Sequence, residues 1–197
     1  MLFSQSFDIR TYVCMRIFYT ASFYGKNKYQ KYYDLVLETI EKTGATVISP
    51  EKGNYKRILT AKARMRDPKL AHYEAIRKNI LQADAVIIEV SFQDLQIGYE
   101  TALAIAAKKP VLCLSIYEDF SQKIDNQYFF GAKYTELDVE EVVAEFVERV
   151  GKKTLGERFN LFLSAVQEEY LEHASREKGI SKSEYVRNLI DKDKLEK

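Results

Sequence analysis

The chain has 197 residues, with 30 Lys and Arg against 29 Asp and Glu and a formal net charge of +1. This length can bury one full hydrophobic core and leave a small appendage. The balanced charge excludes a global basic field that would attract nucleic acid, and also the acidic excess typical of disorder. No run reaches the roughly 20 apolar residues of a membrane span, and the first residues lack the apolar centre of a secretion signal. We therefore expect a cytoplasmic globular protein without membrane contact.

Short apolar runs and helical patterns alternate between residues 15 and 150. Strands are predicted at 15–20, 45–49, 85–90 and 111–115, and helices at 28–43, from 68 to the third strand, at 100–108 and at 139–150. Residues 50–67 are polar and basic without a clear period, which predicts a loop that either covers a ligand or is locally disordered. The alternation implies an α/β fold, a flavodoxin-like parallel sheet with helices on both faces. Ligands then bind outside the carboxyl ends of the strands, near residues 20–26 and 91–100.

Glu100 stands at the end of the segment that follows the third predicted strand. If the alanine-rich helix begins beside it, Glu100 lies in the first helical turn. There, unpaired backbone N–H groups and the helix dipole favour the ionised carboxylate, which is the form that a nucleophile needs. An acid in a first turn is also common simply because it offsets the dipole, so the position alone leaves both interpretations open.

The two cysteines and two histidines give no sign of a metal or cofactor site. Cys14 and Cys113 lie in or beside apolar segments and have no His or Cys at ligand spacing, so we expect reduced, buried thiols. His72 and His173 likewise have no companion ligands, and an ordinary surface or helix-packing role is expected for both. We expect neither a metal nor a cofactor.

A different pattern begins after Gly151, where a polar linker, 151–157, ends the alternation of strands and helices. Residues 158–164 alternate apolar and polar side chains, residues 165–178 carry a helical stripe, and a second helix begins at Ser181. The expected organisation is one α/β domain, 1–150, the linker, and a small module, 158–197. The module resembles a ribbon-helix-helix unit. Such units dimerise through their strands, and many bind DNA.

The α/β segment resembles the nucleoside 2-deoxyribosyltransferase superfamily, which includes the deoxynucleoside 5′-monophosphate N-glycosidases. The resemblance rests on Ile17–Phe23, Ala83–Ile87, Gly98–Glu100 and Lys109–Leu114. It implies that Glu100 is a nucleophile that attacks the anomeric carbon of a deoxyribose, expels the base and leaves a glycosyl-enzyme ester. Water or a second base then resolves the ester, which is the retaining logic of glycoside hydrolysis.

The same resemblance implies further substrate-binding residues and a nucleoside or nucleotide substrate. Asp94 falls where the transferases carry an aspartate that contacts sugar hydroxyls and where the monophosphate glycosidases carry a phosphate-binding serine, which favours a free 5′-hydroxyl. Asn126 matches an asparagine that reaches into a neighbouring subunit's site, and so implies a homo-oligomer with shared active sites. The remaining residues of the implied site come from the sugar loop and the turn before the nucleophile: Tyr19, Ser22, Phe23, Gly25 and Gly98.

Two departures from the family pattern leave other functions open. Ile76 occupies the position of a helix aspartate that positions the substrate, and Ala21 replaces a frequent glycine. A nucleoside or nucleotide sensor without catalytic activity is therefore an alternative. A DNA-binding regulator is a third, but the strand positions that would face DNA are Arg158, Asn160 and Phe162, and only one is basic. Dimerisation without DNA binding is the favoured interpretation of the module.

Overall fold

The computed structural model describes residues 15–65, 67–154 and 161–196. The chain divides into two compact units, Met1–Thr154 and Leu155–Lys197, and each is described by itself. Within the described ranges, no helix combines the length and the apolar character needed to cross a bilayer. Cys14 and residues 155–157 of the predicted linker lie outside these ranges, whereas residues 151–154 of that linker are helical.

The first unit is built on a five-stranded parallel sheet with the order β2-β1-β3-β4-β5. This order is the flavodoxin-like arrangement, so the α/β fold class predicted from the sequence is confirmed. The structure adds a fifth strand that the apolar pattern did not predict. The strands are β1 Arg16–Ala21, β2 Thr46–Ile48, β3 Ala85–Glu89, β4 Val111–Ser115 and β5 Phe129–Lys133.

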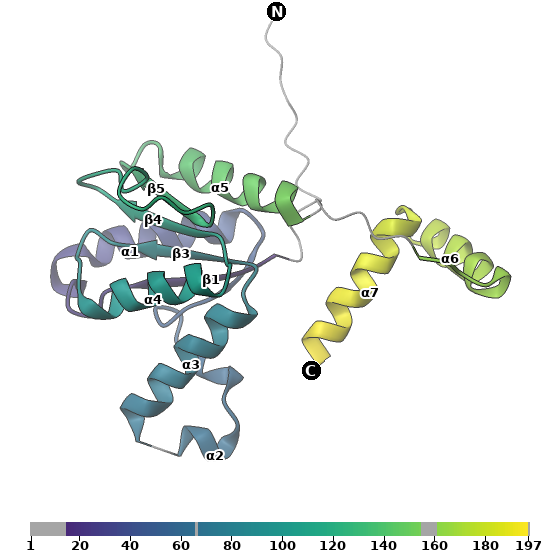
Figure 1. The fold of residues 1–197 in the computed structure, drawn as a ribbon, viewed down its shortest axis with the longest axis horizontal. Coiled ribbons are helices and arrows are strands. Elements are labelled where there is room, and N and C mark those ends of the chain that lie inside the picture. Colours follow the sequence, from purple (N-terminus) through teal and green to yellow (C-terminus); the bar gives the residue numbers. More distant parts are fainter. Residues whose placement is uncertain (1–14, 66, 155–160, 197) are drawn as a thin grey trace, which may run out of the picture. The chain divides into compact units, whose positions relative to one another are not determined.

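Helices cover both faces of this sheet (Figure 1). Helices α1 (Lys26–Lys42) and α5 (Val139–Thr154) pack on one face, and α3 (Pro68–Gln82) and α4 (Leu95–Ala106) pack on the other. Because side chains alternate along a strand, Tyr19 enters the core under α1 and α5, whereas its neighbour Phe18 enters the core under α3 and α4. The central strands β3 and β4 are buried along their whole length, which explains their continuous apolar runs.

The segment between β2 and α3 is not the irregular loop that the sequence indicated. It contains a 3₁₀ turn at Tyr55–Ile58 and a short helix, α2, at Ala61–Arg64. Thr60 begins α2 by accepting a hydrogen bond from the Ala63 N–H, and Asp67 caps α3. These elements are too short for a helical period to be visible, and they pack through a small apolar cluster of their own: Leu59, Ala63, Ala71 and Ala75.

The described part of the C-terminal unit contains two helices, α6 (Ala165–Glu177) and α7 (Lys182–Glu196). A capping box between Ser164 and Gln167 begins α6. Of the predicted strand at 158–164, residues 158–160 lie outside the described ranges and 161–164 form no strand in the single chain. The resemblance of this unit to a ribbon-helix-helix module therefore stays a prediction. The core that the described part of this unit buries is small and consists of Leu171, Ala174 and Tyr185.

Candidate functional site

The candidate site lies at the carboxyl ends of β1 and β3, where the chain enters the loop after β1 and the start of α4. Asp94 is the N-cap of α4, and one of its carboxylate oxygens accepts a hydrogen bond from the Ile97 N–H at 2.8 Å. The other oxygen accepts a hydrogen bond from the hydroxyl of Ser22, the first residue after β1. Ser22 is buried and also accepts from the Tyr24 N–H at 3.2 Å. One carboxylate therefore ties the loop after β1 to the first turn of α4.

Glu100 lies deeper in α4 than the sequence indicated. The helix begins at Leu95, so Glu100 lies in its second turn. The expected helix start at residue 100 would have placed Glu100 in the first turn. Its side chain is 1% exposed. Burial raises the pKa of the Glu100 carboxyl to about 7, and the charge of Asp94 also raises it, while Gln96 and Thr20 lower it. The expectation that the helix dipole favours the ionised form is thus corrected, because desolvation outweighs it.

The two oxygens of the Glu100 carboxylate have different surroundings. Oε1 accepts a hydrogen bond from the Gln96 side-chain amide at 2.7 Å. Oε2 is buried and has no hydrogen-bond partner, and the same holds for the Thr20 hydroxyl oxygen. The Thr20 hydroxyl is near enough to lower the pKa of Glu100, although neither atom completes a hydrogen bond. The lone pairs of Oε2 are thus not engaged in a hydrogen bond, as a nucleophile requires.

A second buried carboxylate, Glu89 at the end of β3, has a different character. The hydroxyl of Tyr134 donates to its Oε1 at 3.1 Å, Ser91 donates from its hydroxyl to the same oxygen, and the Ser91 N–H donates to Oε2 at 3.2 Å. Burial raises the pKa of Glu89 to about 7. Since the Ser91 hydroxyl also accepts from the Ile116 N–H at 3.0 Å, Glu89 joins the segments that follow β3 and β4. Both of its oxygens accept hydrogen bonds, whereas only one oxygen of Glu100 does.

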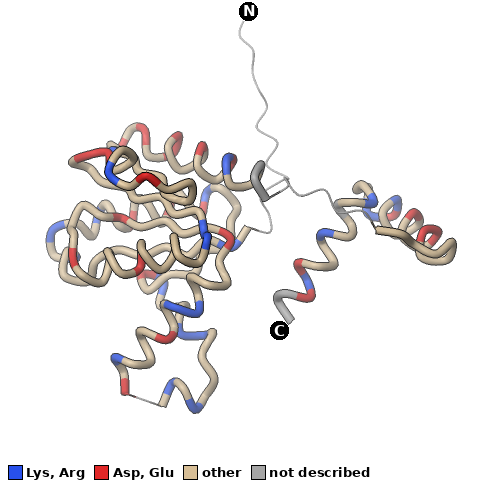
Figure 2. Tube along the Cα trace, in the orientation of Figure 1, with Lys and Arg blue, Asp and Glu red and all other residues tan. Residues whose placement is uncertain are grey.

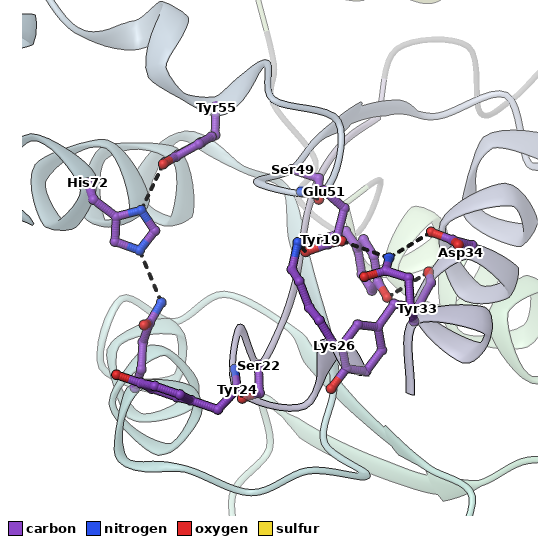
Figure 3. Close-up of polar contacts among 12 residues, drawn as sticks. Tyr19, Ser22, Tyr24, Lys26, Tyr33, Asp34, Ser49, Glu51, Tyr55 and His72 are labelled. Atoms are coloured by element: carbon purple, nitrogen blue, oxygen red, sulfur yellow. Dashed lines mark hydrogen bonds and ion pairs between the residues drawn. The ribbon is translucent and has the colours of Figure 1, made fainter. Parts of the chain in front are cut away.

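Gln96 is itself held by His72 (Figure 3). The His72 Nε2 atom lies 3.2 Å from the Gln96 amide nitrogen, and the Nδ1 atom lies 2.8 Å from the Tyr55 hydroxyl. Burial lowers the pKa of His72, and Lys56 lowers it further. Sequence reasoning gave neither His72 nor Gln96 a part in the site. The available signal was weak: Gln96 precedes Glu100 by four residues, the spacing that brings side chains together on a helix.

Three more of the predicted residues border this region. Gly25 begins α1, and an added Cβ there would lie 2.1 Å from the Tyr33 hydroxyl and 2.7 Å from the Phe92 Cβ. Only glycine fits at this position. Phe23 is exposed in the same loop, and Gly98 is exposed within α4, where an added Cβ would meet nothing.

Tyr19 and Asn126 do not join Glu100 within one chain. The Tyr19 ring is fully buried on the opposite face of the sheet, and its hydroxyl donates to the Tyr33 carbonyl at 2.9 Å, so the ring is not an exposed wall for a base. Asn126 lies three residues before β5, at the amino edge of the sheet, and its side chain accepts from the Tyr128 N–H at 2.9 Å. Its expected contact with a second subunit remains a prediction. Among the described residues, no three His, Cys, Asp or Glu side chains gather to hold a metal ion.

Two curated proteins are similar to the chain in sequence. A 5-hydroxymethyl-dUMP N-hydrolase from Danio rerio is 25% identical over 147 residues, which cover 70% of this chain and 99% of the relative. A protein from Methanosarcina barkeri, named as a 2′-deoxynucleoside 5′-phosphate N-hydrolase, is 30% identical over 99 residues, 50% of this chain and 60% of the relative. No protein-family model matches the chain.

Two solved structures are similar to this chain in part of their fold. A CMP N-glycosidase from Clostridium botulinum aligns with a TM-score of 0.45 and 15% sequence identity, covering 66% of this chain and 98% of the other. A conserved protein from Enterococcus faecalis aligns with a TM-score of 0.41 and 15% identity, covering 71% of this chain and 98% of the other.

Proposed function

We propose that the protein cleaves the N-glycosidic bond of a nucleoside, with Glu100 as the nucleophile. The observation that carries this proposal is the unpartnered, buried Oε2 of Glu100, since the other buried carboxylate, Glu89, has both oxygens occupied. The similarity to two N-hydrolases supports the same class of reaction. A raised pKa in a buried acid at the carboxyl edge of a parallel sheet is typical of a functional group.

The reaction proceeds in two displacements. Oε2 of the ionised Glu100 forms a bond to the anomeric carbon, while the bond from that carbon to the base nitrogen breaks and its electron pair leaves with the base. The base then takes up a proton from solvent. Water, or a second base, attacks the anomeric carbon of the resulting ester, gives up a proton to solvent and releases the carboxylate, so the configuration at that carbon is retained. Gln96 keeps Oε1 oriented through both steps, because its amide donates to that oxygen.

We propose that the substrate carries a free 5′-hydroxyl. A carboxylate at position 94 opposes a phosphate, because unit charges about 4 Å apart interact by roughly 4 kcal/mol at an intermediate dielectric. Lys26, the first residue of α1, does not compensate for this repulsion, because its charge is paired with a carboxylate. Lys26 lies 2.9 Å from Glu51, whose side chain is only 5% exposed (Figure 3). The two curated relatives are named for 5′-phosphate substrates, so the choice of substrate is the point on which this chain is expected to differ.

The test compares base release by the parent protein and by Glu100→Ala on a panel of nucleosides and their 5′-monophosphates. Glu145→Ala, an exposed glutamate on α5, is the matched control. We expect chromatography to detect free base with the parent and the control only, and mass spectrometry to detect a glycosyl adduct on the parent peptide that contains residue 100. A correctly folded Glu100→Ala protein that still releases base would eliminate the assignment.

A non-catalytic nucleoside sensor is the second candidate, and it is favoured by Ile76. This side chain is 3% exposed in the core under α3 and α4, so no carboxylate occupies the helix position at which the resembling enzymes carry an acid. Saturable nucleoside binding in calorimetry, together with no base release by the parent, would favour the sensor.

We further propose that the C-terminal unit dimerises and that a second copy supplies its missing core. Several large apolar side chains of the unit are exposed, and Phe162 is 97% exposed. DNA is the less favoured partner, because four of the five charged side chains on α6 are glutamates (Figure 2). We expect full-length protein to bind random duplex DNA only weakly at physiological salt. Tight binding of a particular duplex would favour the regulator instead.

A further inference from the structure

Hydrogen-bond chemistry fixes the protonation of His72. A Gln amide nitrogen can only donate, so in the contact at 3.2 Å the Nε2 atom of His72 must accept. A neutral imidazole that accepts at Nε2 carries its proton on Nδ1, and that proton is donated to the Tyr55 hydroxyl at 2.8 Å. The groups facing the ring are Tyr55 and Lys56 from the 3₁₀ turn and Gln96 from α4. Lys56 and burial both lower the pKa of His72, in agreement with the neutral ring.

The same amide nitrogen also serves Glu100. One N–H of Gln96 is donated to His72 and the other to Glu100 Oε1 at 2.7 Å. If the amide turned over, its oxygen would face the carboxylate oxygen and repel it. The accepting Nε2 of His72 and Oε1 of Glu100 thus favour the same orientation of the amide.

The position of His72 on α3 gives this arrangement a further meaning. His72 precedes Ile76 by four residues, so the two lie on the same face of α3, one turn apart. Ile76 stands where the resembling family has a carboxylate, and in this chain it is buried among apolar side chains. The polar contact from α3 toward the nucleophile is thus made one turn earlier, and it is made through an amide.

We propose that His72 is a positioning residue: by orienting the Gln96 amide, it holds the Glu100 carboxylate in place for attack. His72 thereby supplies from α3 the polar contact toward Glu100 that Ile76 cannot make. As far as it concerns attack, this inference rests on the proposed function of Glu100. The geometric part does not, because the orientation of a carboxylate can be measured without a substrate.

The first measurement is the pKa of the Glu100 carboxyl, followed by carbon-13 NMR in glutamate-labelled protein and assigned with Glu100→Gln. In His72→Leu the amide loses one of its two acceptors and is held less firmly against Oε1, so the Glu100 pKa should rise by about one unit, the worth of one hydrogen bond to a charged group. In His72→Gln a side-chain oxygen can accept in place of Nε2, so the parent pKa should return. The matched control is His173→Leu, the exposed second histidine of the chain on α6, which should change nothing.

The second measurement is turnover. We expect His72→Leu to lower kcat about tenfold with KM within about twofold, because His72 does not touch the substrate, and His72→Gln to recover most of the loss. Gln96→Leu should lower kcat at least as much, and adding His72→Leu to it should cause no further loss, since His72 acts through Gln96. His72→Ala, which only removes the ring, carries the same expectation if the leucine variant does not fold.

The outcomes separate the two proposals. A parent protein that releases no base refutes the proposed function and leaves the titration to decide the position of Glu100. An unchanged Glu100 pKa in folded His72→Leu and His72→Ala overturns the inference, and so does a double variant whose losses simply multiply.

Discussion

Replacing Glu100 with glutamine should stabilise the protein, and only at neutral and alkaline pH. The glutamine keeps the shape of the side chain and cannot ionise. Its carbonyl oxygen can accept from Gln96 where Oε1 now accepts, and its amide can then face the Thr20 hydroxyl, which has no partner in the parent. The substitution removes the nucleophile, so a gain in stability would accompany the loss of activity.

The magnitude follows from the pKa. In the folded protein the Glu100 pKa is about 7, against an ordinary value of 4.5. Between these values the folded state holds a proton that the unfolded state has released, so the stability of the parent falls as pH rises through this window. At about 1.4 kcal/mol for each pH unit, the total loss is roughly 3 kcal/mol. Below pH 4.5 the parent keeps this stability, and above pH 7 it has lost all of it.

Urea denaturation of the parent and Glu100→Gln at pH 4.5 and pH 8 measures the effect. The difference in the free energy of unfolding should favour the variant by roughly 3 kcal/mol more at pH 8 than at pH 4.5. Glu89 titrates in the same window, but it is present in both proteins and cancels in the difference. Glu145→Gln, on the exposed side of α5, is the control and should show no pH-dependent difference from the parent.

An equal difference at the two pH values would refute the reasoning, because it would mean that Glu100 titrates alike in the folded and unfolded chains. A variant that is less stable at pH 8 would show that the ionised carboxylate is bound favourably in the folded state.

Three further predictions concern the loop after β1, the start of α4 and the C-terminal unit. Asp94→Ser should shift preference toward the 5′-monophosphate in a competition assay while α4 keeps its cap, and an unmoved ratio would show that residue 94 does not face the 5′ end. Gly25→Ala should lower the free energy of unfolding by about 1–3 kcal/mol because the added Cβ meets Tyr33 and Phe92, whereas Gly98→Ala, which meets nothing, should raise it slightly. Removing residues 156–197 should lower the oligomeric state measured by light scattering, and an unchanged number of subunits would contradict the dimer.

The sequence predicted the central strands well because burial of a strand produces a clear apolar pattern. β3 and β4 are buried on both faces, so they appear as uninterrupted apolar runs. β5 lies at the edge of the sheet, is only partly buried, and contains Gly131 where a Cβ would meet the backbone of Ser121, so its pattern is weak. The position of β5 is evident only from its pairing with β4 in the structure.

The candidate site was predictable to the extent that it follows the strands. Ser22, Asp94 and Glu100 come shortly after β1 and β3, so parallel topology alone brings them to one edge. His72 reaches the candidate site because α3 packs on α4, and no local sequence pattern indicates such a long-range contact. The turn in which Glu100 lies was missed for another reason. The helix begins five residues earlier, at Leu95, because Asp94 is its cap, and the alanine-rich stretch marks only its later part.

The capping role of Asp94, together with its proposed role in substrate choice, has a consequence for how that choice can evolve. Helix N-caps are drawn from a short list, chiefly Ser, Thr, Asp and Asn, because only short side chains with an oxygen reach the free N–H groups of the first turn. The resemblance gives this position an aspartate in transferases and a serine in monophosphate glycosidases, and both residues are on that list. A lineage can thus exchange a charged cap for a neutral one in a single substitution and keep α4 intact, so the fold leaves this route between substrates open.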